Sequence, residues 1–148
     1  DDDTVEETNT HRLVGINYPS DVENKLHKIK VAERQAQNIQ GQITIETHQA
    51  IWQERTEYLK KCKIVVGCVD SYDQRDQLER FCRRYNITYI DIGMIVKICE
   101  DEAPQVSGQV ILSLPSKPCM WCMGFINEKK INEERSRYGD AGPQPQVI

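Results

Sequence analysis

The sequence lacks a glycine-rich phosphate-binding loop. Neither G-x-G-x-x-G nor G-x-x-x-x-G-K-[ST] occurs among its 148 residues, although these loops cradle the phosphates in many nucleotide-binding α/β proteins. In such folds an acidic residue at the end of the second strand binds the ribose, about 20 residues after the loop. The chain opens on acids of this kind, Asp1 and Asp3. We therefore expect the loop of any nucleotide site to precede Asp1 in a longer protein.

Long apolar runs and an excess of basic charge are also missing. Uninterrupted apolar runs reach only a few residues, far short of the roughly 20 that span a bilayer, and residues 1–20 show no signal-peptide pattern. The net charge of -4 provides no basic stripe for nucleic acid. With 39% hydrophobic and 28% charged residues, we expect a single soluble domain in the cytosol, without membrane or nucleic-acid partners.

Cysteine occurs six times, but only one pair forms a motif. Free cysteine within an apolar run behaves as a small hydrophobe, which is the expectation for four of them: Cys62, Cys68, Cys82 and Cys99. The motif is Cys119-Met-Trp-Cys122. In an intracellular protein a CxxC pair indicates half a zinc site, or a redox pair, rather than a structural disulfide.

Apolar periodicity alternates between helix and strand along the first two thirds of the chain. Helical spacing covers 20–39, with Ser20 and Glu23 as a capping box, and then 50–61 and 73–85. Strands are predicted over 42–47, 63–69 and 87–92, the second of them typical of a central strand buried on both faces. This order predicts an α/β fold with a Rossmann-like, mostly parallel sheet and helices on both faces.

The pattern changes after Gly93. Two strand-like stretches, 95–99 and 108–114, predict a peripheral antiparallel pair, and residues 139–145 are too rich in Gly and Pro for regular structure. We therefore expect one partial domain made of three parts. These are a nucleotide-binding α/β part (1–93), a strand pair with the CxxC (94–127), and a loop or crossover segment (128–148).

Six landmarks follow one another along the chain. They are Asp1-x-Asp3-x-Val5-Glu6, Asn9-x-x-Arg12, Lys25, Asp70 with Arg75, Gly108-Gln109-Val110 and Cys119-x-x-Cys122. Together they resemble the ThiF/MoeB family of ubiquitin-activating-type adenylating enzymes. The resemblance implies that ATP and Mg²⁺ are used to adenylate the C-terminal glycine of a ubiquitin-like or sulfur-carrier protein, giving an acyl-adenylate and pyrophosphate. It also implies a homodimer.

The resemblance further implies a role for each matching residue. Asp1 would hold the ribose, Asn9, Arg12 and Lys25 the phosphates, and Asp70 the magnesium ion, with Asp3 and Arg75 as further nucleotide-binding residues. Arg12, Lys25 and Asp70 would be the catalytic set. Cys119 and Cys122 would bind Zn²⁺ together with a second CxxC, which in the family lies much later in the chain.

Such a reaction needs no general base. The attacking group is a C-terminal carboxylate, ionised at neutral pH because its ordinary pKa is about 3.5. What the site must supply is positive charge around the attacked phosphate, and alignment of two anions. Arg12, Lys25 and a metal ion can provide the charge. Asp70 has an independent argument, because open parallel sheets place ligands at the carboxyl ends of their strands.

Each assignment has an alternative without function. Most Lys and Arg side chains are simply solvated, which would account for Arg12, Lys25 and Arg75. Asp1 could be a frayed terminal acid, and Asp70 or Ser71 could only cap the helix that follows. Ser71 stands where the family commonly has Asn.

At the level of the protein, two other functions stay open. One is a non-catalytic partner or scaffold half of an activating assembly, and the other is a zinc-binding interaction module. No cysteine follows Cys122, so transfer of the activated protein to a thioester is not indicated. Without a glycine-rich loop, the chain by itself is expected to be nearly inactive.

Overall fold

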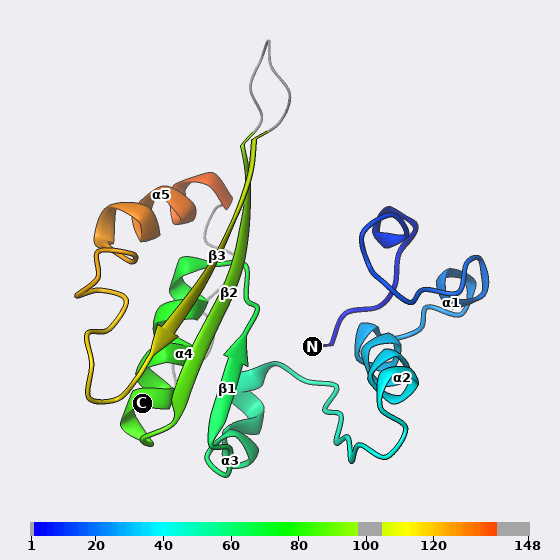
Figure 1. Ribbon diagram of the computed structural model, residues 1–148. Coiled ribbons are helices and arrows are strands. Elements are labelled where there is room, and N and C mark those ends of the chain that lie inside the picture. The colour runs from blue at the N-terminus through cyan, green and yellow to red at the C-terminus, as the bar shows by residue number, and fades with distance from the viewer. Residues whose placement is uncertain (1, 98–104, 139–148) are drawn as a thin grey trace. The chain divides into compact units, whose positions relative to one another are not determined.

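The structure is a computed structural model that describes residues 2–97 and 105–138 (Figure 1). The chain divides into two compact units, unit 1 at Asp1–Thr56 and unit 2 at Glu57–Ile148. Within the described ranges no helix is long and apolar enough to cross a membrane.

Unit 1 is built of short helices. A 3-10 helix at Glu7–Asn9 is followed by α1 (Ser20–Glu23), α2 (Lys28–Ile39) and a second 3-10 helix at Trp52–Arg55. The sequence predicted one helix over 20–39, which is wrong. The chain leaves helical geometry at Lys25, whose φ of 47° lies in the left-handed region, and the N–H of Leu26 turns back to the carbonyl of Asp21 at 2.9 Å.

Two further predictions for unit 1 are wrong. The Ser20–Glu23 capping box does not form, because Pro19 is the N-cap of α1 and no side chain caps the helix. Residues 42–47 do not form a strand. Among the described residues of unit 1, Thr4 and His27 form the single isolated bridge, so this alternating segment has no neighbouring strand to supply ladder hydrogen bonds.

Unit 2 has a three-stranded sheet. Its strands β1 (Ile64–Gly67), β2 (Thr88–Lys97) and β3 (Gln105–Ser113) lie in that order. β1 and β2 are parallel, and β2 and β3 antiparallel. Figure 1 shows α4 (Tyr72–Arg84) alongside the sheet. The predicted α/β fold with an antiparallel strand pair is confirmed.

β2 runs without interruption through Gly93, whereas the sequence predicted one strand ending at Ile92 and another over 95–99. Cys99 lies outside the described residues. In β2, Gly93 pairs with Gln109 of β3. A Cβ atom at Gly93 would lie 2.7 Å from Nη2 of Arg75. The glycine therefore makes room for an arginine instead of ending the strand.

β1 is not buried on both faces. Val65 and Gly67 are buried, whereas Ile64 and Val66 are 56% and 53% exposed. The exposed residues of β1 share their face with apolar residues of β2 and β3, namely Ile92, Met94, Val110 and Leu112. Within unit 2, α4 therefore packs on one face only, and the prediction failed because an apolar run cannot show whether a second layer covers it.

The core of unit 2 lies between α4 and the sheet. Leu78, Phe81 and Cys82 of α4 are buried, as is Tyr89 of β2. Burial raises the pKa of the Cys82 thiol to about 12. By contrast Cys62 and Cys68 are exposed, so of the described single cysteines only Cys82 is the buried hydrophobe that the sequence predicted.

Two helical segments differ from their predictions. The helix predicted over 50–61 is shorter, a 3-10 turn followed by α3 (Thr56–Leu59), in which Tyr58 is exposed. Where a loop was predicted over 128–148, the first part forms α5 (Glu128–Tyr138), and 139–148 lie outside the described residues. α5 is fixed to α4 because Glu134 Oε2 accepts the N–H of Tyr72 at 2.8 Å and Arg135 pairs with Asp73 at 2.9 Å.

Candidate functional site

Asp70 lies in the short turn between β1 and α4, at the carboxyl end of the parallel strand. The helix is capped by its neighbour Ser71, whose Oγ accepts the N–H of Gln74 at 3.0 Å. The capping alternative therefore belongs to Ser71, and the Asp70 carboxylate is exposed. Since Asn is as good an N-cap as Ser, the departure from the family's Asn at Ser71 leaves this arrangement intact.

A pocket of about 210 Å³ opens at this turn. Two segments line it, the turn with the start of α4 and the middle of β2: Cys68, Val69, Asp70, Tyr72 and Arg75, with Ile92, Gly93 and Met94. The pocket thus joins a carboxylate, an aromatic ring and apolar side chains at the edge where open parallel sheets bind ligands.

Arg75 is buried beside the pocket. Its Nε donates to Asp91 Oδ1 at 3.1 Å, and its Nη2 donates to the carbonyl of Val69 at 2.8 Å. The hydroxyl of Tyr89 donates to the same Asp91 oxygen at 3.0 Å. Burial, and then the charge of Asp91, raise the pKa of Tyr89 far above its ordinary value, which favours the protonated hydroxyl that donates to Asp91.

Sequence reasoning missed Asp91 and Tyr89. One signal was available, because a carboxylate between Ile90 and Ile92 interrupts an otherwise apolar strand. A charge in such a strand is seldom buried without a partner. The partner itself could not be found from spacing, since Arg75 lies on a helix that precedes the strand.

Unit 1 holds the remaining predicted nucleotide residues, except Asp1, which lies outside the described residues. Asp3 pairs with Lys28 at 2.7 Å. Asn9 is buried: its Oδ1 accepts the N–H of Glu6 at 3.1 Å, and its carbonyl accepts the N–H of Arg12 at 3.0 Å. Asn9 therefore fixes the backbone from which Arg12 projects.

Arg12 and Lys25 have exposed side chains. The backbone of Lys25 is left-handed and ends the turn that follows α1. In α1 itself, the buried side chain of Asp21 accepts hydrogen bonds from Arg34 and from the N–H of Asn17. These two bonds, that from Arg34 first, lower the pKa of Asp21. The predicted nucleotide residues are divided between the two units. Within unit 1 the structure brings Asn9 together with Arg12, and within unit 2 it brings Asp70 together with Arg75.

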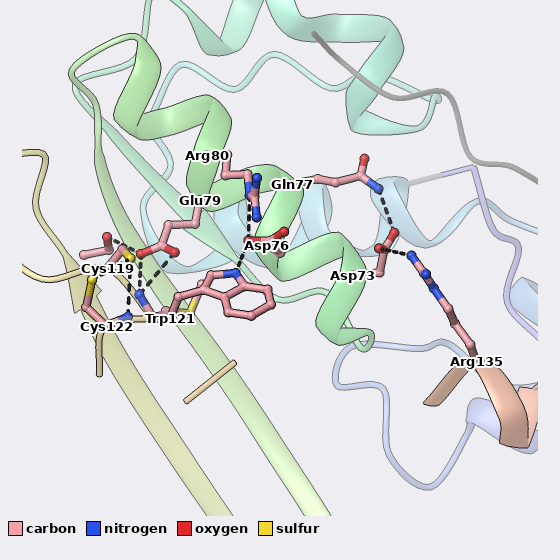
Figure 2. Close-up of polar contacts among 11 residues, drawn as sticks. Asp73, Asp76, Gln77, Glu79, Arg80, Cys119, Trp121, Cys122 and Arg135 are labelled. Carbon is pink, nitrogen blue, oxygen red and sulfur yellow. Dashed lines mark hydrogen bonds and ion pairs between the residues drawn. The ribbon is translucent and has the colours of Figure 1, made fainter. Parts of the chain in front are cut away.

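The CxxC turn is held against α4 by a buried carboxylate (Figure 2). Glu79 is 1% exposed and accepts the hydroxyl of Ser113 at 2.5 Å and the N–H of Met120 at 2.9 Å. Figure 2 also shows the Trp121 indole directed at Asp76, to which its Nε1 donates at 2.5 Å. None of these helix contacts was predicted.

Within this turn the two sulfur atoms are 3.4 Å apart. The N–H of Cys122 points at the Cys119 sulfur, 3.5 Å away, and this donor is the main reason that the pKa of the Cys119 thiol is lowered. A lowered pKa favours the thiolate, the form that binds metals and reacts with electrophiles.

A sequence model of the ThiF family matches residues 1–143. The chain belongs to the ThiF family. Members of this family are adenylyltransferases that bind ATP with Mg²⁺ and act on ubiquitin-like or sulfur-carrier proteins. No curated protein matches the chain.

The ThiF chemistry sets a test for each implied metal. Magnesium is usually held by one or two carboxylates together with substrate phosphates, and an exposed aspartate lining a pocket fits that requirement. Structural zinc takes four ligands. Among the described residues no group of three or more His, Cys, Asp or Glu side chains could hold a metal ion, so no described side chain joins Cys119 and Cys122 as a third ligand.

Proposed function

We propose that this ThiF-family chain takes part in the ATP-dependent adenylation of a C-terminal glycine carboxylate on a ubiquitin-like or sulfur-carrier protein. The carboxylate attacks the α-phosphate of ATP, a carboxyl-phosphoryl bond forms, and the bond to the β-phosphate breaks to release pyrophosphate. The observation that carries the proposal is the position of Asp70. It is an exposed carboxylate beside a pocket at the carboxyl end of β1.

Asp70 would hold the magnesium ion in this reaction. When bound, the ion supplies positive charge that offsets the charge developing on the phosphates. The chain's own contribution is placement. Ser71 caps α4, so the Asp70 carboxylate is left for a ligand, and the turn between β1 and α4 holds it at the pocket.

Arg12, Lys25 and Asn9 would act on the phosphates. Two exposed cations can bind an anion without first breaking a buried contact, and a phosphate prefers such donors. Asn9 would act largely through Arg12, because its buried side chain and carbonyl fix the turn that carries Arg12. Asp1 would bind the ribose, whose hydroxyls donate hydrogen bonds to a carboxylate, and Asp3 would be a further nucleotide-binding residue.

Cys119 and Cys122 would be two ligands of a zinc ion completed by two further groups. Their role would be structural, because Glu79 and Trp121 fasten the turn to α4 and nothing in the reaction requires a redox metal. The reading as a free-standing zinc module is weaker, since two thiols provide half of the tetrahedral set.

Pyrophosphate exchange by the full-length protein tests the proposal. Labelled pyrophosphate should enter ATP only when Mg²⁺ and a carrier protein ending in Gly-Gly are both present. The matched control is the same carrier with its C-terminus amidated, which removes the attacking carboxylate and should abolish exchange. Exchange that persists with the amidated carrier would contradict the proposed chemistry.

The same assay distinguishes the proposed adenylation from the alternative function, a non-catalytic scaffold half. This alternative predicts that the protein binds the carrier but exchanges no pyrophosphate with any carrier tested.

A family-like homodimer belongs to the proposal as well, with β3 among the surfaces available for contact. Sedimentation of the full-length protein as a monomer would rule the homodimer out.

A further inference from the structure

Arg75 is the buried cation among the described residues of unit 2, and its contacts point away from phosphate binding. We propose that Arg75 is a positioning residue, which holds the peptide between Val69 and Asp70 in place so that Asp70 is presented to the pocket. The effect of Arg75 on catalysis rests on the proposed function, but its effect on the turn at Asp70 can be tested separately.

The first step is the hydrogen bond to the turn. Nη2 of Arg75 donates to the carbonyl of Val69 at 2.8 Å. That carbonyl belongs to the peptide group whose nitrogen is part of Asp70, and a peptide group is planar. Fixing the Val69 carbonyl therefore fixes the plane from which the Asp70 backbone departs, and so limits where its carboxylate can go.

The second step is that Arg75 is itself fixed. Asp91 of β2 is fully buried and accepts from Arg75 Nε at 3.1 Å and from the Tyr89 hydroxyl at 3.0 Å. Its other oxygen has no hydrogen-bond partner among the described residues. Since a buried carboxylate is costly without a cation, Arg75 cannot leave this position without stranding the charge of Asp91.

The third step is that the sheet is shaped around these side chains. A Cβ atom at Gly67 of β1 would lie 2.3 Å from the Tyr89 hydroxyl, and one at Gly93 of β2 would lie 2.7 Å from Nη2 of Arg75. Both distances are too short for any real contact. Two neighbouring strands thus carry glycine at the positions where the hydrogen-bonded side chains of Tyr89, Asp91 and Arg75 need space.

A direct phosphate contact fits this geometry poorly. The Arg75 side chain is only 7% exposed, and its charge faces the opposite charge of Asp91. A phosphate would have to compete with a carboxylate and a carbonyl that already use Nε and Nη2. Arg12 and Lys25, which are exposed, meet no such competition.

The experiment uses Arg75→Lys in the full-length protein, with Arg80→Lys as the matched control on an exposed position of the same helix. Lysine keeps the charge that Asp91 needs, but a single ammonium cannot reproduce the planar fork that reaches both Asp91 and the Val69 carbonyl. We expect amide hydrogen exchange across residues 68–72 to become at least about tenfold faster in Arg75→Lys and to stay unchanged in Arg80→Lys.

Kinetics provide a readout that a general loss of stability would not give. In Arg75→Lys we expect the Mg²⁺ concentration for half-maximal pyrophosphate exchange to rise about tenfold, with the KM for ATP at saturating Mg²⁺ nearly unchanged, since one lost hydrogen bond corresponds to a factor of this order. If the KM for ATP rises and the Mg²⁺ requirement does not, Arg75 is a phosphate ligand and the inference is wrong.

Failure of the inference and failure of the proposed function are distinguishable. Wild-type protein without any pyrophosphate exchange would refute the proposed function, while amide exchange would still report on the turn. Unchanged amide exchange across 68–72 in folded Arg75→Lys would refute the positioning role. If that variant does not fold, Asp91→Asn keeps the size and the Oδ1 acceptor and removes the charge, and it should loosen the same turn.

Discussion

At the scale of single residues, the unexpected feature of unit 2 is that two buried carboxylates organise its loops. Glu79 gathers donors from β3 and the CxxC turn, and Asp91 gathers them from α4 and β2. A buried carboxylate is tolerated when several donors replace its water. Sequence periodicity identified the apolar neighbours of both residues, but it carries no information on which donors, tens of residues away, would meet them.

Replacing Glu79 with alanine should destabilise the protein by about 2–4 kcal/mol, because Ser113 and Met120 would keep buried donors without an acceptor. Glu79→Gln is the matched control, since it retains size and one acceptor oxygen, and it should cost about half as much. Urea unfolding of both variants measures the difference. A free energy of unfolding for Glu79→Ala equal to that of the wild type would contradict the buried contacts.

Asp21 makes the stability of unit 1 depend on pH. Arg34 and the N–H of Asn17 lower its pKa in the folded chain, so the unfolded chain, with an ordinary pKa of about 3.9, binds the proton more readily. The stabilisation from Asp21 is therefore complete above about pH 5 and is lost as the pH falls through the folded pKa. We expect Asp21→Asn to flatten the acid limb of the stability profile, measured by unfolding at a series of pH values, whereas an unchanged limb would show that Asp21 is not the group responsible.

At the scale of elements, predictions succeeded where a segment's own pattern decides its structure. The α4 helix follows an apolar period that the chain shows directly, and Ser71 begins the helix as a standard N-cap. Two of the predictions that failed depended on neighbours. Residues 42–47 alternate like a strand but have none beside them in unit 1, and β1 is apolar throughout although only one of its faces is covered in unit 2.

Gly67 and Gly108 lie in the same sheet, but we expect their replacement by alanine to affect the stability of the protein very differently. Gly67→Ala should destabilise the protein by about 1–3 kcal/mol, because the new methyl group would collide with the Tyr89 hydroxyl. Gly108→Ala should change stability by less than about 0.5 kcal/mol, since its Cβ would lie 3.7 Å from the nearest atom, the carbonyl of Gly93. Thermal unfolding of the pair measures this, and equal effects would mean that Tyr89 does not occupy the space above Gly67.

At the scale of the whole molecule, the family could be read from the sequence because its landmarks are short motifs in a fixed order. Asp70, Arg12, Lys25 and the CxxC are among the landmarks that carried the resemblance, and the match over residues 1–143 confirms the family. The roles of the surrounding residues could not be read in this way. Arg75 and Asp91 lie 16 positions apart and meet only because α4 folds back on β2. The resemblance therefore implied that Arg75 binds the nucleotide. We propose instead, from its contacts in the structure, that Arg75 positions Asp70.

The central claim is that Asp70 holds the metal of an adenylation site, and its most direct test is pyrophosphate exchange by the Asp70→Ala variant of the full-length protein. We predict that exchange falls by at least about 100-fold, as expected when a metal ligand in a reaction of this kind is removed, while the thermal stability stays close to that of the wild type because the Asp70 side chain is exposed. Glu57→Ala, which removes an exposed carboxylate elsewhere in unit 2, should exchange like the wild type. Undiminished exchange by folded Asp70→Ala would contradict the account.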